Sequence, residues 1–218
     1  MRACRIERQA AFLQQDSRND ARVTRPAVSN HHRQPGKVAG GFNEESKDMA
    51  DTATLHDAFI DELRDTYDAE RQLIKALPRL AKAADSVDLR KAFETHLEET
   101  RGHVERLTAV FESLDEKVRG KHCDGMAGII EEGKSVLEED YEASAMDAVL
   151  IAAGQRAEHY EMAAYGTLVA WARALGHTKA ADLLEQSLDE EKAADAKLSA
   201  LAEGGINDEA ASMRAAAE

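Results

Sequence analysis

Four segments of this chain have the residue spacing of amphipathic helices, yet each places acidic or imidazole side chains on its apolar face. The residues concerned are Glu62, Glu70, Glu99, Glu158, Glu191 and Asp195, together with His96, His103 and His159. Carboxylates rarely stay buried unless they are paired or bind a metal ion. Four inward-facing helices that carry Glu and His are what a carboxylate-bridged pair of metal ions requires.

The apolar spacing predicts four long helices, over about 54–84, 86–114, 144–175 and 178–203. We expect Thr52 or Thr54 to cap the first helix and Ser86 or Asp88 to cap the second. Gly176 is expected to end the third helix. Few aromatic residues and abundant Ala, Leu, Glu and Lys also favour helix over sheet.

The connections between these helices predict the topology. The first and last connections are short, whereas residues 115–143 form a long connection that contains a short amphipathic helix with Met126, Ile129, Ile130 and Leu137 on its apolar side. Pro78, inside the first helix, predicts a kink or a broken last turn. We therefore predict an all-α, ferritin-like four-helix bundle with a long crossover connection.

Both ends of the chain differ in character from its centre. Residues 1–48 are rich in Arg, Gln, Asn, Ser and Gly, and we interpret them as a disordered basic tail. A second interpretation is that translation starts at Met49, directly before the first helical signal. The predicted division is thus a tail over 1–48, a four-helix domain over 49–203 and a flexible acidic tail over 204–218.

Charge and cysteine content exclude several classes of function. The net charge is −14, and residues 1–48 carry nine Lys and Arg against six Asp and Glu, a net +3, which leaves −17 for the rest. An acidic body disfavours nucleic acid and anionic membranes as partners but suits cations. No apolar run approaches the roughly 20 residues that span a bilayer. Two cysteines, Cys4 and Cys123, make no disulfide framework, so we predict a cytoplasmic protein.

The inward-facing residues fall into a repeated pattern. Glu70 and Glu158 each follow an alanine and would occupy equivalent places on the first and third long helices. Glu99 with His103, and Glu191 with Asp195, are i,i+4 pairs on the second and fourth. We predict these six residues and His159 as metal ligands. The predicted ligands are Glu70, Glu99, His103, Glu158, His159, Glu191 and Asp195. Further candidates are Glu62, His96 and Glu161. Iron or manganese suits such hard ligands.

Several of these residues also have an ordinary structural explanation. His96 alone suits a core histidine with satisfied hydrogen bonds, and Glu62 suits the end of the bundle, where it would reach solvent. Glu99 lies near the edge of the apolar face of its helix and would suit an ion pair with Arg101 or Arg106.

Glu161 and Asp195 would likewise suit salt bridges to Arg or Lys at a dimer surface. A purely structural network, however, would have to bury several carboxylates beside few histidines, at a cost of several kcal/mol per unpaired ion. A bound cation is the simpler interpretation. Because no phosphate-binding glycine loop is present, we expect no nucleotide cofactor, and we expect no haem.

Five runs of this sequence resemble the YciE/YciF family. They are Tyr67-Asp68-Ala69-Glu70, His96-Leu97-Glu98-Glu99-Thr100, Glu158-His159-Tyr160-Glu161 followed by Tyr165 and Gly166, Gly125-Met126 within the connection, and Leu188-Asp189-Glu190-Glu191-Lys192. The resemblance covers about 54–203. It implies a bacterial ferritin-like domain linked to stress responses, commonly a homodimer, and implies little about activity. A redox-active metal site of the kind predicted above would use a small oxidant such as peroxide or oxygen.

One departure from ferritin-like metal sites concerns the histidines. Such sites usually carry Glu-x-x-His on the second and fourth helices, whereas here the second offers His96-x-x-Glu99 and the fourth offers no histidine. Two main functions therefore stay open from the sequence, beside a third, nucleic-acid protection, that could come only from the basic tail over 1–48. One is a metal-binding protein that oxidises Fe(II) or consumes peroxide, and the other is a non-enzymatic dimeric bundle whose polar core is structural.

Overall fold

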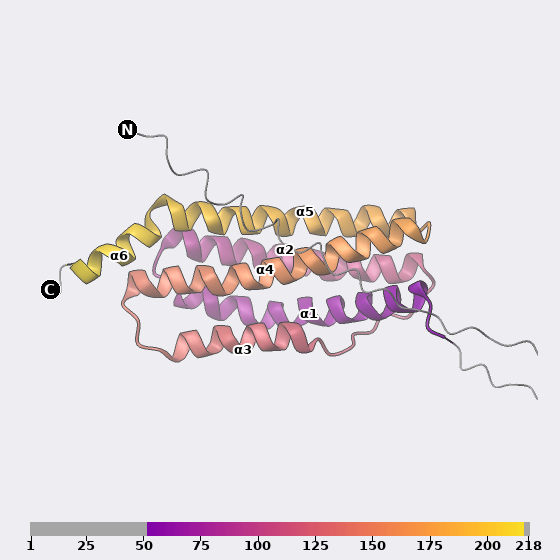
Figure 1. Ribbon diagram of the computed structural model, residues 1–218, viewed down its shortest axis with the longest axis horizontal. Coiled ribbons are helices and arrows are strands. Elements are labelled where there is room, and N and C mark those ends of the chain that lie inside the picture. Colours follow the sequence, from indigo (N-terminus) through magenta and orange to yellow (C-terminus); the bar gives the residue numbers. More distant parts are fainter. Residues whose placement is uncertain (1–51, 216–218) are drawn as a thin grey trace, which may run out of the picture. The chain divides into compact units, whose positions relative to one another are not determined.

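The computed structural model describes residues 52–215, and the side chains through residue 212; within this range the chain is helical and has no strand. Four long helices, α1 (Leu55–Ala83), α2 (Val87–Ser113), α4 (Ala143–Ala174) and α5 (Thr178–Leu201), pack into a four-helix bundle (Figure 1). This confirms the predicted all-α class. The expectations for residues 1–48 and for a start at Met49 lie outside the described residues.

The connection between the two helical hairpins crosses the length of the bundle. Helices α1 and α2 form one antiparallel hairpin, and α4 and α5 form the other (Figure 1). The chain leaves α2 at one end and reaches α4 at the opposite end, and on the way it forms α3 (Asp124–Glu138), which lies along α1 and α4. The predicted crossover and its short extra helix are therefore both present.

Local sequence signals set the helix ends. Thr54 caps α1: its side chain accepts from the Asp57 N–H, and the Asp57 carboxylate accepts in return from the Thr54 N–H at 2.8 Å. Ser86 accepts from the Leu89 N–H and caps α2. After α4 the chain turns at Gly176, whose φ of +78° is a conformation that glycine adopts without strain.

Two expectations concerned helix ends. Helix α1 continues past Pro78 to Ala83, so its last turn is not broken, and the alternative expectation, a kink at Pro78, stays a prediction. Beyond residue 204, where we expected a flexible acidic tail, the chain forms a further helix, α6 (Asn207–Ala215). The turn Ala202–Ile206 joins α5 to α6. The side chains of Ala202 and Ile206 pack against the core at this end of the bundle, and this packing stabilises the turn that leads into α6.

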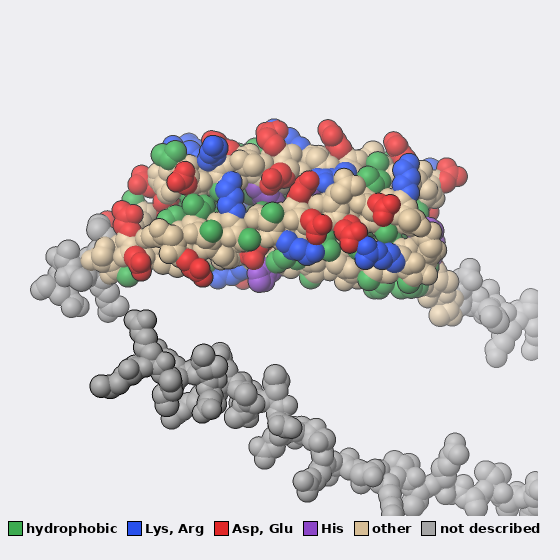
Figure 2. Space-filling model, turned by 90° about the horizontal axis from the view of Figure 1, so that it is seen from above, with side chains coloured by type: hydrophobic (Ala, Val, Ile, Leu, Met, Phe, Trp, Pro, Cys, Tyr) green, Lys and Arg blue, Asp and Glu red, His purple; other side chains and the backbone are tan. Residues whose placement is uncertain are grey.

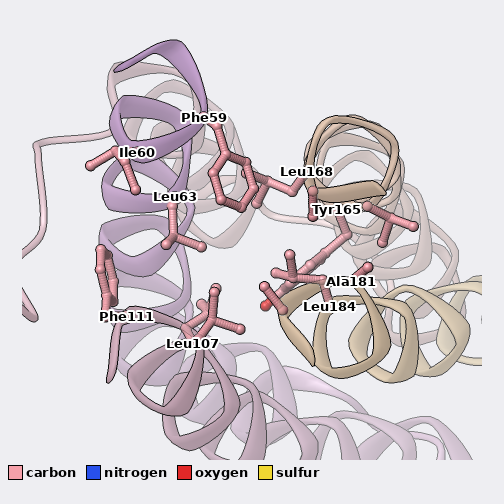
Figure 3. Packing of buried hydrophobic residues seen from close by; sticks show 13 residues of the cluster. Phe59, Ile60, Leu63, Leu107, Phe111, Tyr165, Leu168, Ala181 and Leu184 are labelled. Atoms are coloured by element: carbon pink, nitrogen blue, oxygen red, sulfur yellow. The ribbon is translucent and has the colours of Figure 1, made fainter. Parts of the chain in front are cut away.

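The apolar core is divided into two clusters, one near each end of the bundle. The first contains Phe59, Leu63, Leu107, Phe111, Tyr165, Leu168 and Leu184 (Figure 3). The second contains Leu73, Leu77, Leu89, Phe93, Leu150, Ile151 and Leu198. Each long helix therefore contributes apolar side chains at both ends, and the stretch between them is left to other residues.

The surface carries acidic and basic side chains interspersed with one another (Figure 2). Large exposed apolar side chains among the described residues are Leu55, Val87, Val118 and Tyr141, which are scattered along the chain. Within 52–215, none of the helices combines the length and apolar character needed to cross a membrane.

A buried aspartate joins the two hairpins at one end. Asp147 on α4 accepts from the backbone N–H groups of Asp85 and Ser86, at 2.9 and 2.7 Å, and thereby satisfies donors at the start of α2.

We predict that Asp147→Ala lowers the free energy of unfolding by about 1–3 kcal/mol, because it leaves two backbone donors without a charged acceptor. Chemical denaturation in the presence of chelator measures the change. The control is Asp140→Ala, an exposed residue of the preceding connection, which should change stability by no more than about 0.5 kcal/mol. Equal effects of the two substitutions would contradict the capping role.

Candidate metal centre

Six buried polar side chains meet in the middle of the bundle, between the two apolar clusters. They are Glu70 on α1, His96 and His103 on α2, Glu158 and Glu161 on α4, and Glu191 on α5. His96 and His103 are seven residues apart, or about two helical turns, so they share the buried face of α2. Glu158 and Glu161 are three apart and share the buried face of α4 for the same reason.

The potential ligand atoms form two groups that have one residue in common. One atom each of Glu70, His103 and Glu191 lie within 4.8 Å of one another, and so do atoms of His96, Glu158, Glu161 and Glu191. Glu191 Oε1 is 2.8 Å from His103 Nδ1, and Glu191 Oε2 is 3.7 Å from His96 Nε2. The two oxygens of Glu191 thus face different histidines, which is the arrangement of a carboxylate that bridges two ions.

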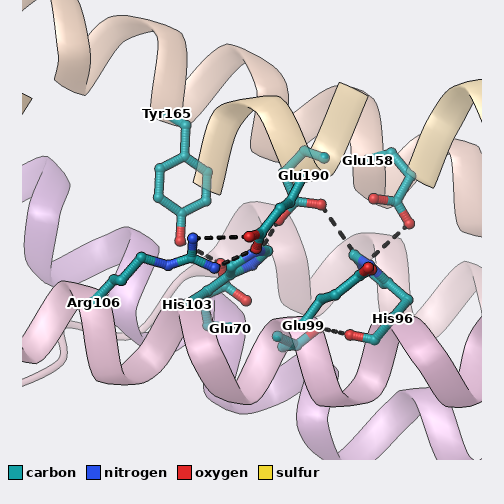
Figure 4. A network of polar contacts seen from close by, with 10 residues as sticks. Glu70, His96, Glu99, His103, Arg106, Glu158, Tyr165 and Glu190 are labelled. Carbon is teal, nitrogen blue, oxygen red and sulfur yellow. Dashed lines mark hydrogen bonds and ion pairs between the residues drawn. The ribbon is translucent and has the colours of Figure 1, made fainter. Parts of the chain in front are cut away.

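Contacts on the outer side of His103 hold its ring in place. His103 Nε2 lies 2.9 Å from a carboxylate oxygen of Glu190, and Arg106 donates to that same carboxylate (Figure 4). An N–H on Nε2 that donates to Glu190 leaves the lone pair of Nδ1 directed inward, toward Glu70 and Glu191 at 3.1 and 2.8 Å. His103 is therefore oriented as a metal ligand would be.

A tyrosine holds the carboxylate of Glu70. The Tyr165 O–H donates to Glu70 Oε1 at 2.5 Å, and the Tyr165 ring lies edge-on to His103 with ring centroids 5.8 Å apart (Figure 4). Glu70 Oε2 accepts no hydrogen bond and is buried. One oxygen of Glu70 is therefore fixed by the phenol, and the other is available to a cation.

The cluster has more buried acceptors than its own donors can satisfy. Across residues 52–212, both oxygens of Glu161, both of Glu191 and Oε2 of Glu158 are buried and accept no hydrogen bond. His103 Nδ1 and His96 Nε2 lie at ion-pair distances from neighbouring oxygens but lack the alignment of a hydrogen bond. Because a buried carboxylate without a partner costs several kcal/mol, these atoms need either protons or a cation.

The electrostatics of the cluster favour protons when no cation is bound. Burial raises the pKa of Glu158 and of Glu161 well above the ordinary 4.5, and the charges of neighbouring carboxylates raise both further. For His103, burial lowers the pKa, but the carboxylates of Glu191 and Glu70, which lie 2.8 and 3.1 Å from its Nδ1, outweigh burial and raise the pKa to about 10. A metal ion that binds here must displace these protons.

The composition of the cluster fits a pair of hard divalent cations. Four ionised carboxylates and two neutral imidazoles carry a charge of −4, which two divalent ions would balance. Carboxylate oxygen and imidazole nitrogen are ligands of iron and manganese. The thiol of Cys123 takes no part: its Sγ lies 3.0 Å from the Tyr160 hydroxyl, and burial raises its pKa.

The structure brings together six of the ten residues that the sequence suggested as ligands. Four others, Glu62, Glu99, His159 and Asp195, belong to neither group. His159 is exposed and lies 3.3 Å from Asp195, because it directly follows Glu158 and a helix turns about 100° between successive residues. Glu99 is partly exposed, 3.4 Å from His96 Nδ1, and Glu62 is partly buried on α1.

Two structural explanations from the sequence were wrong. Glu161 makes no salt bridge to Arg or Lys at a surface, since its side chain is fully buried in the bundle. Glu99 pairs with neither candidate arginine, because Arg101 binds Glu98 and Arg106 binds Glu190.

Three residues that orient the cluster, namely Tyr165, Glu190 and Arg106, were not predicted from the sequence in this role. Arg106 follows His103 by one helical turn, and this spacing was the available signal for a group that supports the ring. The reach of Glu190 from α5 to α2 has no such signal, because it depends on how the two helices pack.

Comparisons with known proteins show which family the chain resembles. A family model described as "Domain of unknown function (DUF892)" matches residues 54–211. The chain is similar to Protein YciF of Escherichia coli strain K12, with 48% identity over 158 residues that cover 72% of this chain and 95% of that protein.

Solved structures of similar proteins have the same helical fold. The crystal structure of the E. coli stress protein YciF superposes with a TM-score of 0.69 at 48% identity, covering 72% of this chain and 99% of that one. YcfI from Rhodopseudomonas palustris gives a TM-score of 0.67 at 42% identity, covering 69% of this chain and 96% of that one. A Xanthomonas campestris protein at 19% identity and a TM-score of 0.56, covering 70% and 94%, shares the fold.

We predict that the metal-free protein loses stability as the pH rises from about 5.5 to 9. Glu158, Glu161 and His103 bind protons more tightly folded than unfolded, so their contribution is complete below the unfolded pKa values and is lost toward the folded ones. Urea denaturation in chelator at several pH values measures this fall.

Glu161→Gln provides the matched test, because the amide has the shape of the protonated acid but never ionises. In chelator this variant should show a shallower fall with pH and higher stability than wild type at pH 8–9. A profile as steep as that of wild type would show that Glu161 does not hold a proton in the folded protein.

Proposed function

The chain belongs to the DUF892 family of YciE/YciF proteins, and from this premise we propose that it is a ferritin-like stress-response protein that binds two Fe(II) or Mn(II) ions inside its bundle. The observation that carries the proposal is Glu161, whose two oxygens are fully buried and accept no hydrogen bond. Because three further carboxylates lie nearby, the buried negative charge of Glu161 would be compensated by a bound cation.

The protein residues would hold two ions in unequal surroundings. Glu191 would bridge them, Glu70 and His103 would complete one position, and His96, Glu158 and Glu161 would complete the other. A pair of redox-active ions there would supply electrons to dioxygen or peroxide. The bundle's own part is to bind the ions, to orient their ligands and to keep bulk water away with apolar clusters on both sides.

The groups around the ligands would keep the geometry constant while the ions change charge. Arg106 and Glu190 hold the His103 ring through its outer nitrogen, and Tyr165 holds one oxygen of Glu70. Glu158 and Glu161 keep one or more oxygens free of other partners. A rigid first set of ligands with free carboxylate oxygens suits a centre that must bind both reduced and oxidised iron.

The competing function is a non-enzymatic bundle whose polar core fixes helix register. His103 favours it, because three carboxylates, those of Glu70, Glu190 and Glu191, already surround its ring. On either proposal we expect a homodimer, as the resemblance to YciE/YciF proteins implies, and a cytoplasmic location, as the cysteine content suggests. The oligomeric state and the compartment stay predictions.

We predict that the full-length protein retains about two equivalents of Fe(II) or Mn(II) per protomer after anaerobic loading and desalting, measured by elemental analysis. Glu191→Ala should lose both equivalents, because Glu191 faces both positions. Glu98→Ala, an exposed residue on α2, is the control and should bind as wild type does. Near-zero metal in wild type would remove the metal-binding function.

Glu70→Ala separates the metal centre from a structural network. In chelator, a metal centre predicts that this variant keeps its fold and most of its stability, while metal no longer raises the unfolding temperature. A structural network predicts the same loss of stability with and without metal. Thermal unfolding followed by circular dichroism, with and without Mn(II), distinguishes the two.

We further predict that the protein oxidises added Fe(II) with dioxygen or peroxide faster than Glu191→Ala does, by at least about tenfold. The rise of ferric absorbance, with dioxygen followed by electrode, measures the reaction. Equal rates for the two proteins would leave a protein that binds metal without turning it over.

A further inference from the structure

A cavity of about 100 Å³ lies between α2 and α5 and reaches the metal centre from outside. Its rim includes the exposed residues Thr95, Ala193 and Lys197, and its inner wall includes the buried His96 and Glu158. Because a water molecule occupies roughly 30 Å³ in the liquid, the cavity has room for more than one. It therefore offers a partly hydrated cation a way in.

The ring of His96 stands between an outer and an inner carboxylate in this cavity. Its Nδ1 lies 3.4 Å from Glu99 Oε2, which is partly exposed, and its Nε2 lies 3.3 Å from Glu158 Oε1, which is buried (Figure 4). His96 Nε2 and Glu158 Oε2 are both buried without a hydrogen bond. The inner end of the cavity thus presents unpartnered ligand atoms to whatever enters.

A second cavity reaches Glu158 from the opposite side but suits cations poorly. It measures about 40 Å³ and lies between α1, α3 and α4, lined mainly by apolar side chains such as Leu73, Leu77 and Ile129. A cation that enters there would lose its water with no carboxylate along the way to replace it, at a large cost in free energy. The α2–α5 cavity offers Glu99 and His96 instead.

We propose that the α2–α5 cavity is the route by which divalent cations reach the metal centre, with Glu99 as the outer carboxylate that first takes the ion and His96 as the group that passes it to Glu158. The proposal rests on the function proposed above. It also gives Glu99 a role other than that of a ligand in the final centre.

Charge and size at the rim then govern how fast metal enters. Glu99 attracts a cation, whereas Lys197 repels it, so their neutral variants should change the loading rate in opposite directions. Ala194 lines the same cavity, and a larger side chain there narrows the passage. These changes act on the rate of loading and leave Glu191 and the other buried ligands in place.

The experiment mixes full-length, metal-free protein with Co(II) in a stopped-flow instrument and follows the absorbance of the bound ion. Glu99→Gln should slow loading about tenfold, and Lys197→Gln should speed it about threefold. The matched controls are Glu98→Gln and Lys192→Gln, which change the same charges on the same helices outside the cavity. Both controls should load at the wild-type rate.

A pair of alanine substitutions compares the two routes. Ala194→Leu narrows the α2–α5 cavity and should slow loading, while Ala76→Leu narrows the apolar cavity and should not. Final Co(II) per protomer, measured after equilibration, is the second readout, and it should stay at the wild-type value in Ala194→Leu.

The outcomes separate the route from the metal centre. Full final binding with unchanged rates in Glu99→Gln and Ala194→Leu would overturn the route alone, as would slow loading confined to Ala76→Leu. A loss of final equivalents in Glu99→Gln would make Glu99 a ligand and overturn its role in entry. Wild type that binds no Co(II) at any time would overturn the route and the proposed function together.

Discussion

The bundle depends on how it compensates the charge of four carboxylates buried at its centre. Two imidazoles, one phenol and the Glu190–Arg106 pair satisfy part of that cluster, but both oxygens of Glu161 and of Glu191 remain without a hydrogen bond. Protons can neutralise such groups only while the pH stays below their raised pKa values. Cations would neutralise these carboxylates at any pH at which the carboxylates ionise. They would also be bound by the buried oxygens that accept no hydrogen bond.

The apolar clusters on both sides make this compensation necessary. They exclude bulk water from Glu70, Glu161 and Glu191, which line neither cavity, so these carboxylates cannot be solvated in place. The same packing aligns the helices, since each long helix anchors its polar stretch between two apolar ends. The same arrangement of side chains therefore stabilises the two ends of the bundle and leaves carboxylates at its centre that need protons or cations.

Periodicity was enough to predict the fold and four of the six cluster residues as ligands, with the other two, His96 and Glu161, as further candidates. The helix spans, the crossover and its short helix follow from apolar spacing and cap residues such as Thr54 and Ser86, which are local signals. Position on the apolar face of a helix likewise identified Glu70, His103, Glu158 and Glu191. Glu99 and Asp195 were paired with them at i,i+4, but such pairing says nothing about which residue of a pair faces the neighbouring helix. That choice depends on interhelical packing, as does the contact between His103 and Glu190.

The two positions that share Glu191 differ in charge, and this difference sets the order in which they should fill. Glu70 and His103 supply one carboxylate besides the shared one, whereas His96, Glu158 and Glu161 supply two. A divalent ion is held more tightly where more carboxylates surround it. The more acidic position is also the one whose His96 and Glu158 line the α2–α5 cavity. If ions enter by the proposed route, the first would meet the more acidic position, and its charge would lower the attraction for a second ion bound for Glu70 and His103.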